Sequence, residues 1–339
     1  MTDSFTHSIS IVIPVYKGAD VIAPLVEEIN SVFRSSGLEF RTNNGNKASI
    51  TEVILVHDGG TDNSPKVMRS LENEYEFVRC VWLSRNFGQH AATLAGIAAS
   101  QGDWIITIDE DGQQNPAYIS SFLDRAIETN SQVVYARPTN KPPHGVIRNG
   151  FSKLAKKISK KILAGAEFEN FNSYRLILGE PARALSAYGG TGIYLDAALM
   201  WVTSSATTCD VELRSEDRSS SYTFGSLLSH FGRLVVTAGA RPLRVIALLG
   251  MLVATGGFLL AMYIVWMKFT GGIPAAGWAS VIVAVLVTSG LTMLSLGVIS
   301  EFLGAAVRSS MGKPLYLVVS DPINGPLREN VDKSAERHN

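Results

Sequence analysis

The chain has 339 residues with 30 basic and 30 acidic side chains, so it carries no formal net charge at neutral pH. This balance gives no global electrostatic reason to expect a nucleic acid partner. The two cysteines, Cys80 and Cys209, lie far apart without metal-ligand spacing, which argues against a disulfide framework or a zinc site. The polar first residues lack the basic and apolar regions of a cleaved signal peptide, and we expect the soluble part to face a reducing cytosol.

Strands and helices are predicted to alternate along the first part of the chain. The predicted elements are strands at 10–15, 52–56, 78–83, 104–108 and 132–136, and helices at 20–33 and 88–100. This alternation predicts an α/β fold with a mostly parallel sheet covered by helices on both faces. The polar stretch at 41–51 is interpreted as a surface insertion.

Ligands of such sheets bind beyond the carboxyl ends of the strands, where Tyr16, Asp58, Arg85 and Asp109 fall in this sequence. Asp109 begins an acidic triplet, 109–111, directly after an apolar strand. Acidic side chains gain little from packing there, so a bound cation or a substrate hydroxyl is the expected partner. A solvated turn before the next helix is the alternative.

Four motifs occur in order at the predicted strand ends: IVIPVY, VHDGGTD, LSRNFGQHAA and TIDEDGQQNP. Together they resemble glycosyltransferase family two, specifically its polyprenyl-phosphate sugar transferases. The segments PLRVIALLG, from residue 242, and GVISEFLGAAVRSSMGKPLYLV, ending at 318, are similar to the two-span tail of the bactoprenol glucosyltransferases. The resemblance extends from residue 10 to about 319.

This resemblance implies a GT-A fold and a UDP- or GDP-linked sugar donor. Its implied nucleotide-sugar contacts are Pro14, Tyr16, Asp58, Arg85 and Asp109. Its implied catalytic and metal-binding residues are Asp109, Asp111 and Gln113, which surround Mg²⁺ or Mn²⁺. A hard cation would bridge the donor diphosphate, which carboxylates alone would repel.

Two departures from the family pattern concern the donor site. Lys17 and Gly18 stand where the family usually has Asn-Glu, and His57 stands where the family commonly has aspartate. The missing carboxylate at Gly18 puts the nucleotide identity in question. His57 is either a replacement contact or a buried strand-end histidine.

By the same resemblance, Arg137, Arg148 and Ser152 bind the phosphate of a lipid acceptor, a role that suits the forked donors of arginine; surface arginines at a helix start are the alternative. The sequence at 148–163 predicts a basic amphipathic helix able to lie on an anionic membrane surface. A helix packed on the soluble core with a solvated lysine face is the alternative.

The segment 212–223 resembles a family segment near the active site, which assigns Arg214 and Tyr222 there through a loose alignment. Trp201 matches a family tryptophan, but an aromatic residue in an apolar run is more typical of a core.

Two uncharged runs, 245–267 and 273–300, are each long enough to cross a bilayer, with the second span expected at about 277–300. Two long helices buried in a soluble protein are the alternative. Basic residues outside both runs place the flanks in the cytoplasm. We therefore expect a GT-A domain at 1–232, a membrane anchor at 233–307 and a cytoplasmic tail at 308–339, in a multi-pass protein of the cell inner membrane.

The sequence thus predicts an inverting, metal-dependent transfer of sugar from a nucleotide sugar to polyprenyl phosphate. Two spans make a poor bundle alone, which suggests self-association. The alternatives are a glycosyltransferase acting on another membrane-associated acceptor in polysaccharide synthesis and an inactive scaffold on the same frame.

Overall fold

The computed structural model describes residues 5–33, 39–140, 171–188, 195–214, 277–311 and 314–324, together with scattered positions between 250 and 270. The chain divides into two compact units. The first comprises 1–152, 166–221 and 314–339, and the second comprises 153–165 and 222–313.

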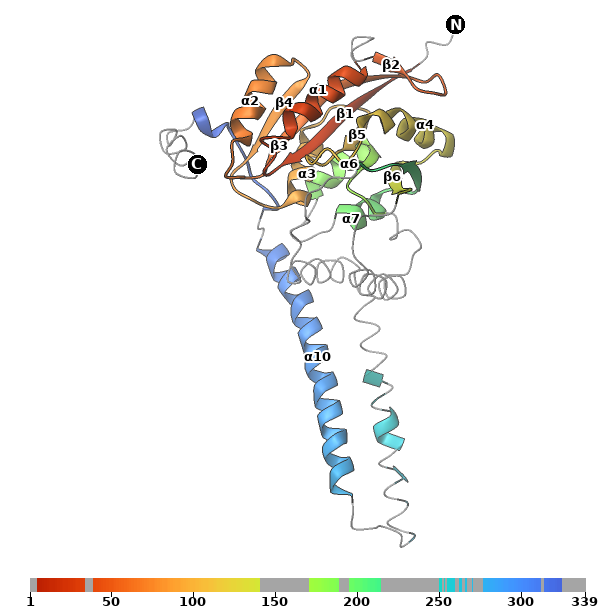
Figure 1. Cartoon of the computed structure of the whole chain (residues 1–339). Helices are drawn as coiled ribbons and strands as arrows, with labels where there is room; N and C mark the ends of the chain where they lie inside the picture. The colour runs from red at the N-terminus through yellow and green to blue at the C-terminus, as the bar shows by residue number, and fades with distance from the viewer. Residues whose placement is uncertain are drawn as a thin grey trace. The chain divides into compact units, whose positions relative to one another are not determined.

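The first unit is built on a nine-stranded sheet (Figure 1). Its strands are β1 (Thr6–Val15), β2 (Glu39–Arg41), β3 (Lys47–His57), β4 (Val78–Leu83), β5 (Trp104–Thr107), β6 (Val133–Pro138), β7 (Arg175–Leu178), β8 (Ala206–Val211) and β9 (Val318–Val319). The spatial order is β8-β6-β7-β5-β1-β3-β4-β9, with β2 paired to β3 off this path. The central strands β5, β1, β3 and β4 are parallel, and the antiparallel strand β7 separates them from the parallel pair β6 and β8.

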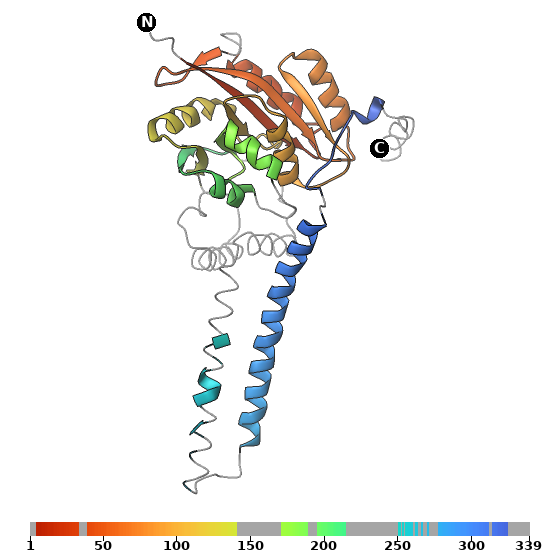
Figure 2. The ribbon, with the colours of Figure 1, turned by 180° about the vertical axis from the view of Figure 1, so that it is seen from behind.

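Helices cover both faces of this sheet (Figure 2). On one face, α1 (Ile22–Phe33), α2 (Ser64–Glu74) and α4 (Ile119–Thr129) enclose one apolar cluster. On the other face, α3 (Gln89–Ala99), α6 (Gly179–Tyr188) and α7 (Leu195–Val202) enclose a second cluster. The short 3-10 helices η2 (Pro116–Tyr118) and η4 (Pro322–Asn324) complete the unit. The prediction of a mostly parallel sheet covered on both faces is therefore confirmed.

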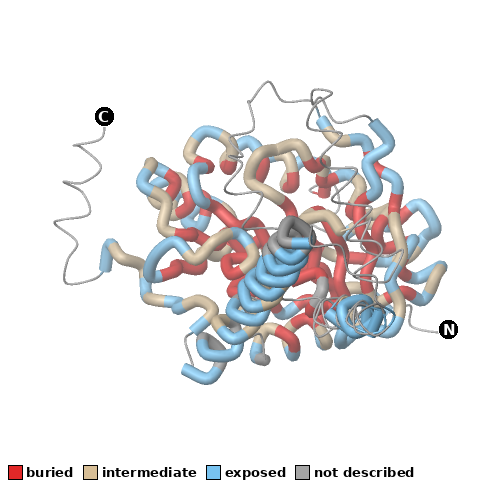
Figure 3. Tube along the Cα trace, turned by 90° about the horizontal axis from the view of Figure 1, so that it is seen from below, coloured by how far each residue is buried: buried red, intermediate tan, exposed pale blue. Residues whose placement is uncertain are grey.

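The sequence explains why the central strands lie inside. Residues 9–15 of β1 are all buried, because a parallel strand between two helical layers has no solvent face. Figure 3 shows the buried segments of the chain gathered in the interior of the unit. Along α1, Leu25, Val26, Ile29 and Phe33 recur at helical spacing and face the first cluster.

The interpretation of residues 41–51 as a surface insertion is wrong. β2 and the start of β3 form an antiparallel hairpin, in which Arg41 pairs with Lys47. Ala48 and Ile50 point into the core, whereas Lys47 is exposed. A strand needs only that buried apolar and exposed polar residues alternate along it. The many polar residues of this stretch made that alternation hard to recognise in the sequence.

The expected boundary at residue 308 also differs from the structure. β9 pairs antiparallel with β4, with Trp82 opposite Val319. Arg69 on α2 donates to both carboxylate oxygens of Asp321, from Nε at 2.7 Å and from Nη2 at 2.6 Å. Residues 314–324 are therefore part of the sheet unit and not a separate tail.

The second unit contains α10 (Trp278–Ser310). Its stretch Val287–Gly304 is long and apolar enough to cross a membrane, judged by length and composition, and none of that stretch is buried. Apolar side chains such as Met293 and Leu303 are exposed, so the alternative of a helix buried in a soluble core does not apply to α10. Of the first expected span, the described positions 255–259 are helical. The predicted amphipathic helix at 148–163 lies outside the described residues.

Candidate active site

Three strand-end loops meet closely at the carboxyl edge of the sheet. A β-carbon added at Gly60 would lie 1.5 Å from the carbonyl oxygen of Tyr16, and one added at Gly59 would lie 2.5 Å from the backbone nitrogen of Asn86. Gly59 also has a φ of +66°, in the left-handed region that favours glycine. These two glycines after β3 allow the loops following β1 and β4 to approach the loop between them.

Asp109, which follows β5, is held by side chains from three segments. Its Oδ1 accepts from Nε2 of Gln89 at 2.5 Å, and its Oδ2 accepts from Nε2 of Gln114 at 2.9 Å and from the Ser173 hydroxyl. Burial raises the pKa of Asp109, and the nearby charge of Asp111 raises it further. These donors set the orientation of the carboxylate in advance.

The acidic loop turns sharply after Asp109. Gly112 has a φ of +72°, and the backbone nitrogen of Gln113 donates to Oδ1 of Asp111 at 3.1 Å. The carbonyl oxygen of Gln113 accepts from the backbone nitrogen of Arg214 at 3.0 Å, which brings the segment after β8 against this loop. Asp111 and Gln113 are therefore both half-buried at the edge of the sheet.

The acidic loop offers oxygen donors of the kind that a divalent cation requires. Among the described residues, no group of three or more histidine, cysteine or carboxylate side chains is arranged to hold a metal ion. The carboxylates of Asp109 and Asp111 and the amide oxygen of Gln113 are hard donors, and magnesium is commonly bound by one or two carboxylates together with substrate phosphates. Burial is the main cause of the raised pKa of Asp109, and a cation would offset the smaller contribution from the charge of Asp111. The residues fit an ion that binds together with a diphosphate.

Asp58, after β3, organises the neighbouring loop. Its side chain is 3% exposed, and its two oxygens accept from the backbone nitrogens of Phe87 at 2.7 Å and Gly88 at 2.9 Å. Burial raises its pKa, and these hydrogen bonds act in the opposite direction. The exposed guanidinium of Arg85 stacks 4.1 Å from the centre of the Phe87 ring. Asp58 thus holds the loop that carries Arg85 and leads into α3.

Of the other residues expected to contact the nucleotide, Pro14 is buried in β1 opposite Val56. Tyr16 is exposed at the edge of the sheet, and Nζ of Lys17 lies 5.5 Å from the centre of its ring. Tyr16 is therefore accessible to a ligand at this edge.

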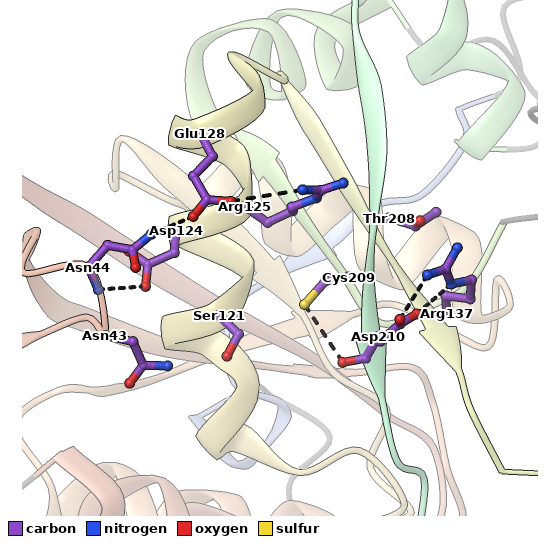
Figure 4. A pocket seen from close by; sticks show the side chains of 10 residues that line it. All are labelled: Asn43, Asn44, Ser121, Asp124, Arg125, Glu128, Arg137, Thr208, Cys209 and Asp210. Carbon is purple, nitrogen blue, oxygen red and sulfur yellow. Dashed lines mark hydrogen bonds and ion pairs between the residues drawn. The ribbon is translucent and has the colours of Figure 1, made fainter.

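The structure does not bring Arg137 into contact with the acidic loop. Its Nη2 donates to Oδ2 of Asp210 on β8 at 2.8 Å, and a second hydrogen bond joins its Nε to Oδ1. Figure 4 shows this pair at one side of a polar hollow of about 420 Å³. The hollow is also lined by Asn43, Asn44, Ser121, Asp124, Arg125, Glu128, Thr208 and Cys209.

The remaining assigned residues have different outcomes. Arg214 lies beside the acidic loop through its backbone, while its guanidinium forms a two-bond ion pair with Glu28 on α1. Arg148, Ser152 and Tyr222 lie outside the described residues. The interpretation of Trp201 as a core residue is wrong, because its side chain is 62% exposed at the end of α7.

His57 is a buried strand-end histidine. Its ring lies 5.5 Å from that of Trp82, and its Nε2 has no hydrogen-bond partner within the described part of the chain. Burial lowers the pKa of His57 below its ordinary value. The ring of His57 therefore packs on Trp82 in the interior.

This histidine predicts a pH dependence of stability. Below about pH 6.5, His57 becomes protonated in the unfolded chain but stays neutral in the folded chain, because its folded-state pKa is lowered. The free energy of unfolding should therefore decrease as the pH falls from about 6.5 to this lowered pKa. We expect His57→Phe, which keeps a ring against Trp82, to show a smaller decrease of Tm between pH 7.5 and 5.5 than the unaltered chain. Equal decreases would contradict this assignment.

Several residues of the site were not predicted from the sequence. Gln89 lies in the motif LSRNFGQHAA and Gln114 in TIDEDGQQNP. Their amide side chains, which can donate to a carboxylate, were the feature from which they could have been predicted. Ser173, in the segment before β7, donates to Asp109. The sequence of that segment has no pattern that predicts a strand or a site. Arg175 on β7 forms a buried ion pair with Asp196 on α7, and its positive charge partly offsets the rise in the pKa of Asp109 that burial causes. These contacts depend on the antiparallel strand β7, which the sequence did not predict.

The mostly parallel sheet with an acidic loop after a central strand is an architecture of the GT-A-like class. Comparison with known proteins supports this class. A family model described as glycosyl transferase family 2 matches residues 10–183. The chain belongs to glycosyl transferase family 2.

Its relatives include two curated proteins that it matches over nearly their whole length. It is 27% identical to undecaprenyl-phosphate 4-deoxy-4-formamido-L-arabinose transferase of Proteus mirabilis, over 92% of this chain and 93% of that protein. It is 26% identical to an uncharacterized glycosyltransferase of Synechocystis, over 92% of this chain and 95% of that protein. Among solved structures, mannosyl-3-phosphoglycerate synthase from Rubrobacter xylanophilus matches with a TM-score of 0.49 and 16% identity, over 69% of this chain and 74% of that chain.

Proposed function

We propose that this glycosyltransferase transfers a sugar from a UDP- or GDP-linked donor to polyprenyl phosphate, with inversion at the anomeric carbon. The observation that carries the proposal is the acidic loop at the carboxyl edge of the sheet, in which Asp109 is oriented by side-chain donors and lies beside Asp111. The name of the Proteus mirabilis relative, together with its match over nearly the whole chain, supports the choice of acceptor.

The acceptor needs little activation from the protein. A phosphate monoester has a second pKa of about 6, so its oxygen is already anionic near neutral pH. The residues of this chain then act mainly by orientation and by stabilising charge. Tyr16 and the loop held by Asp58 border the donor, and Gln89, Gln114 and Ser173 keep Asp109 in position.

Asp109, Asp111 and Gln113 are the residues that would hold Mg²⁺ or Mn²⁺. When bound, such an ion neutralises the charge that builds on the leaving nucleotide diphosphate. Without a cation the negative charges of the two carboxylates would disfavour a diphosphate.

The acceptor side of the proposal concerns Arg137, Arg148 and Ser152, with Arg214 and Tyr222 near the donor. Arginine can bind a phosphate through two parallel hydrogen bonds. For Arg137 this requires a phosphate to compete with Asp210 for the guanidinium, and both of these side chains are largely exposed. An exposed pair of this kind contributes little stability, so the exchange of partners costs little.

The location that we propose is the cytoplasmic face of the cell inner membrane. The exposed apolar surface of α10 supports it, because a stretch of this length and composition is suited to hydrocarbon. The basic residues that flank both apolar runs in the sequence support a cytoplasmic side for the catalytic unit. Self-association through the spans remains part of the proposal.

The test is sugar transfer to undecaprenyl phosphate in detergent, using a panel of radiolabelled UDP and GDP sugars with Mg²⁺ or Mn²⁺. A chloroform-soluble labelled product identifies the donor and the acceptor class. Absence of a lipid product with every donor, from folded protein, would reject the lipid-phosphate acceptor. Hydrolysis or transfer to another acceptor would then indicate a different transferase, and lack of any donor turnover would indicate a scaffold.

A further inference from the structure

Glu110, the middle residue of the acidic triplet, forms its hydrogen bonds with the loop that follows β1. Its Oε2 accepts from the backbone nitrogen of Tyr16 at 3.0 Å, and its Oε1 accepts from the backbone nitrogen of Lys17 at 3.2 Å. One carboxylate therefore binds two successive amides of the loop that follows β1. This contact joins the acidic loop directly to the loop that carries Tyr16.

Gly18 provides the space for this carboxylate. A β-carbon added at Gly18 would lie 2.5 Å from Oε2 of Glu110, well inside the closest normal contact. Gly18 is buried, and its φ is not in the left-handed region, so the constraint is steric and not conformational. A residue with a side chain at position 18 and glutamate at position 110 would compete for the same volume.

The next two amides of this loop are bound from another side. The backbone nitrogen of Gly18 donates to the hydroxyl of Ser64 at 2.9 Å, and that of Ala19 donates to Oδ2 of Asp62 at 3.2 Å. Asp62 and Ser64 are hydrogen-bonded to each other at 2.7 Å. Four successive amides are thus held by the loops after β5 and β3, and Glu110 supplies the link to the acidic loop.

We propose that Glu110 is a positioning residue of the donor site, which fixes Tyr16 relative to the acidic loop, and that the missing side chain of Gly18 leaves the space for its carboxylate. This inference rests on the proposed function and extends it to a residue that does not touch the reacting atoms. It also explains the glycine at position 18: the carboxylate in this space comes from the acidic loop and not from residue 18.

The geometry predicts that glutamine cannot replace this glutamate. Each carboxylate oxygen accepts one N–H, whereas a glutamine side chain has a single acceptor oxygen and would set its NH₂ group against the second N–H donor. Glutamine therefore removes the charge and one of the two hydrogen bonds while keeping the size.

The experiment uses the full chain in detergent and compares Glu110→Gln with Glu74→Gln, a control at an exposed site on α2. Hydrogen exchange of peptides that cover residues 16–19 measures the link itself, and donor KM, acceptor KM and kcat measure its role. For Glu110→Gln we expect faster exchange at 16–17 and a donor KM raised about tenfold, with kcat and acceptor KM changed less than about threefold. The control should change none of these values.

A double-mutant cycle tests the pairing with Gly18. Gly18→Ala alone should raise the donor KM as Glu110→Ala does, because the methyl group displaces the carboxylate. The double variant should be no worse than Glu110→Ala, because the displaced group is gone and the nearest remaining atom is the Val15 side chain at 3.2 Å. Additive effects would overturn the pairing.

Three outcomes would overturn the positioning role. Unchanged exchange and donor KM in Glu110→Gln would show that the link is not used. A loss of kcat at constant donor KM would show that Glu110 acts in the reaction itself. Failure of the unaltered chain to bind any UDP or GDP sugar, measured by calorimetry with Mn²⁺, would remove the proposed function and the role with it, while the exchange data would still report on the link.

Discussion

Asp111→Asn is expected to reduce sugar transfer by about two to three orders of magnitude, the range found when a group that stabilises transition-state charge is removed. The substitution keeps the size of the side chain and an oxygen that can accept from the Gln113 backbone at the position now occupied by Oδ1. The fold of the loop should therefore persist, while the negative charge that a divalent cation requires is lost. The measurement is kcat/KM over a series of Mn²⁺ concentrations, with Tm recorded alongside.

The matched control is Glu76→Gln, which also removes one negative charge but lies exposed before β4, away from the carboxyl edge. We expect this control to keep the kcat/KM and Tm of the unaltered chain. Transfer by Asp111→Asn within threefold of the unaltered chain, at saturating Mn²⁺, would contradict the assignment of Asp111 to the metal.

Removal of residues 314–339 is expected to destabilise the catalytic unit by about 2–4 kcal/mol. The deletion removes the pairing of β9 with β4, the bond from the Ser84 nitrogen to the Leu317 oxygen at 3.0 Å, and the ion pair of Arg69 with Asp321. Hydrogen bonds of this kind contribute about 1 kcal/mol each, and the ion pair is discounted for its partial exposure. Tm should fall by roughly 5–15 °C for a unit of this size.

Deletion of residues 314–339 should also weaken donor binding. β4 leads directly to the loop of Arg85 that Asp58 holds, and the Arg69 guanidinium stacks 4.9 Å from the centre of the Trp82 ring. We therefore expect a higher donor KM in the shortened chain. The control is a deletion of 325–339, which keeps every contact described here and should leave Tm unchanged. Equal Tm values for both deletions would refute the contribution of β9.

Some of this protein could be predicted from sequence because the signals are local. Apolar runs ended by polar residues identified β1, β3, β4 and β5 and their carboxyl ends, since a buried parallel strand needs continuous apolar residues. The order of motifs indicated the family, which the match over residues 10–183 bears out. The acidic loop was found because carboxylates directly after a buried strand have few structural reasons to be there.

Other features depended on contacts between segments distant in the chain. β7 brings Ser173 to Asp109, and β9 closes the sheet beside β4, yet each is a short strand without a distinctive pattern. Trp201 was assigned to the core from an apolar context, although a helix of eight residues leaves part of its apolar surface exposed.

The donor site shows the same division between sequence and tertiary structure. By itself the sequence determined the fold class, the family and the positions of Asp109, Asp111 and Asp58 at strand ends. An apolar run followed directly by carboxylates can be recognised from neighbouring residues alone. It presented Gly18 only as a missing carboxylate. Tertiary structure alone decided that Glu110 fills that space, since two residues 92 positions apart share one volume only after β1 and β5 pair side by side.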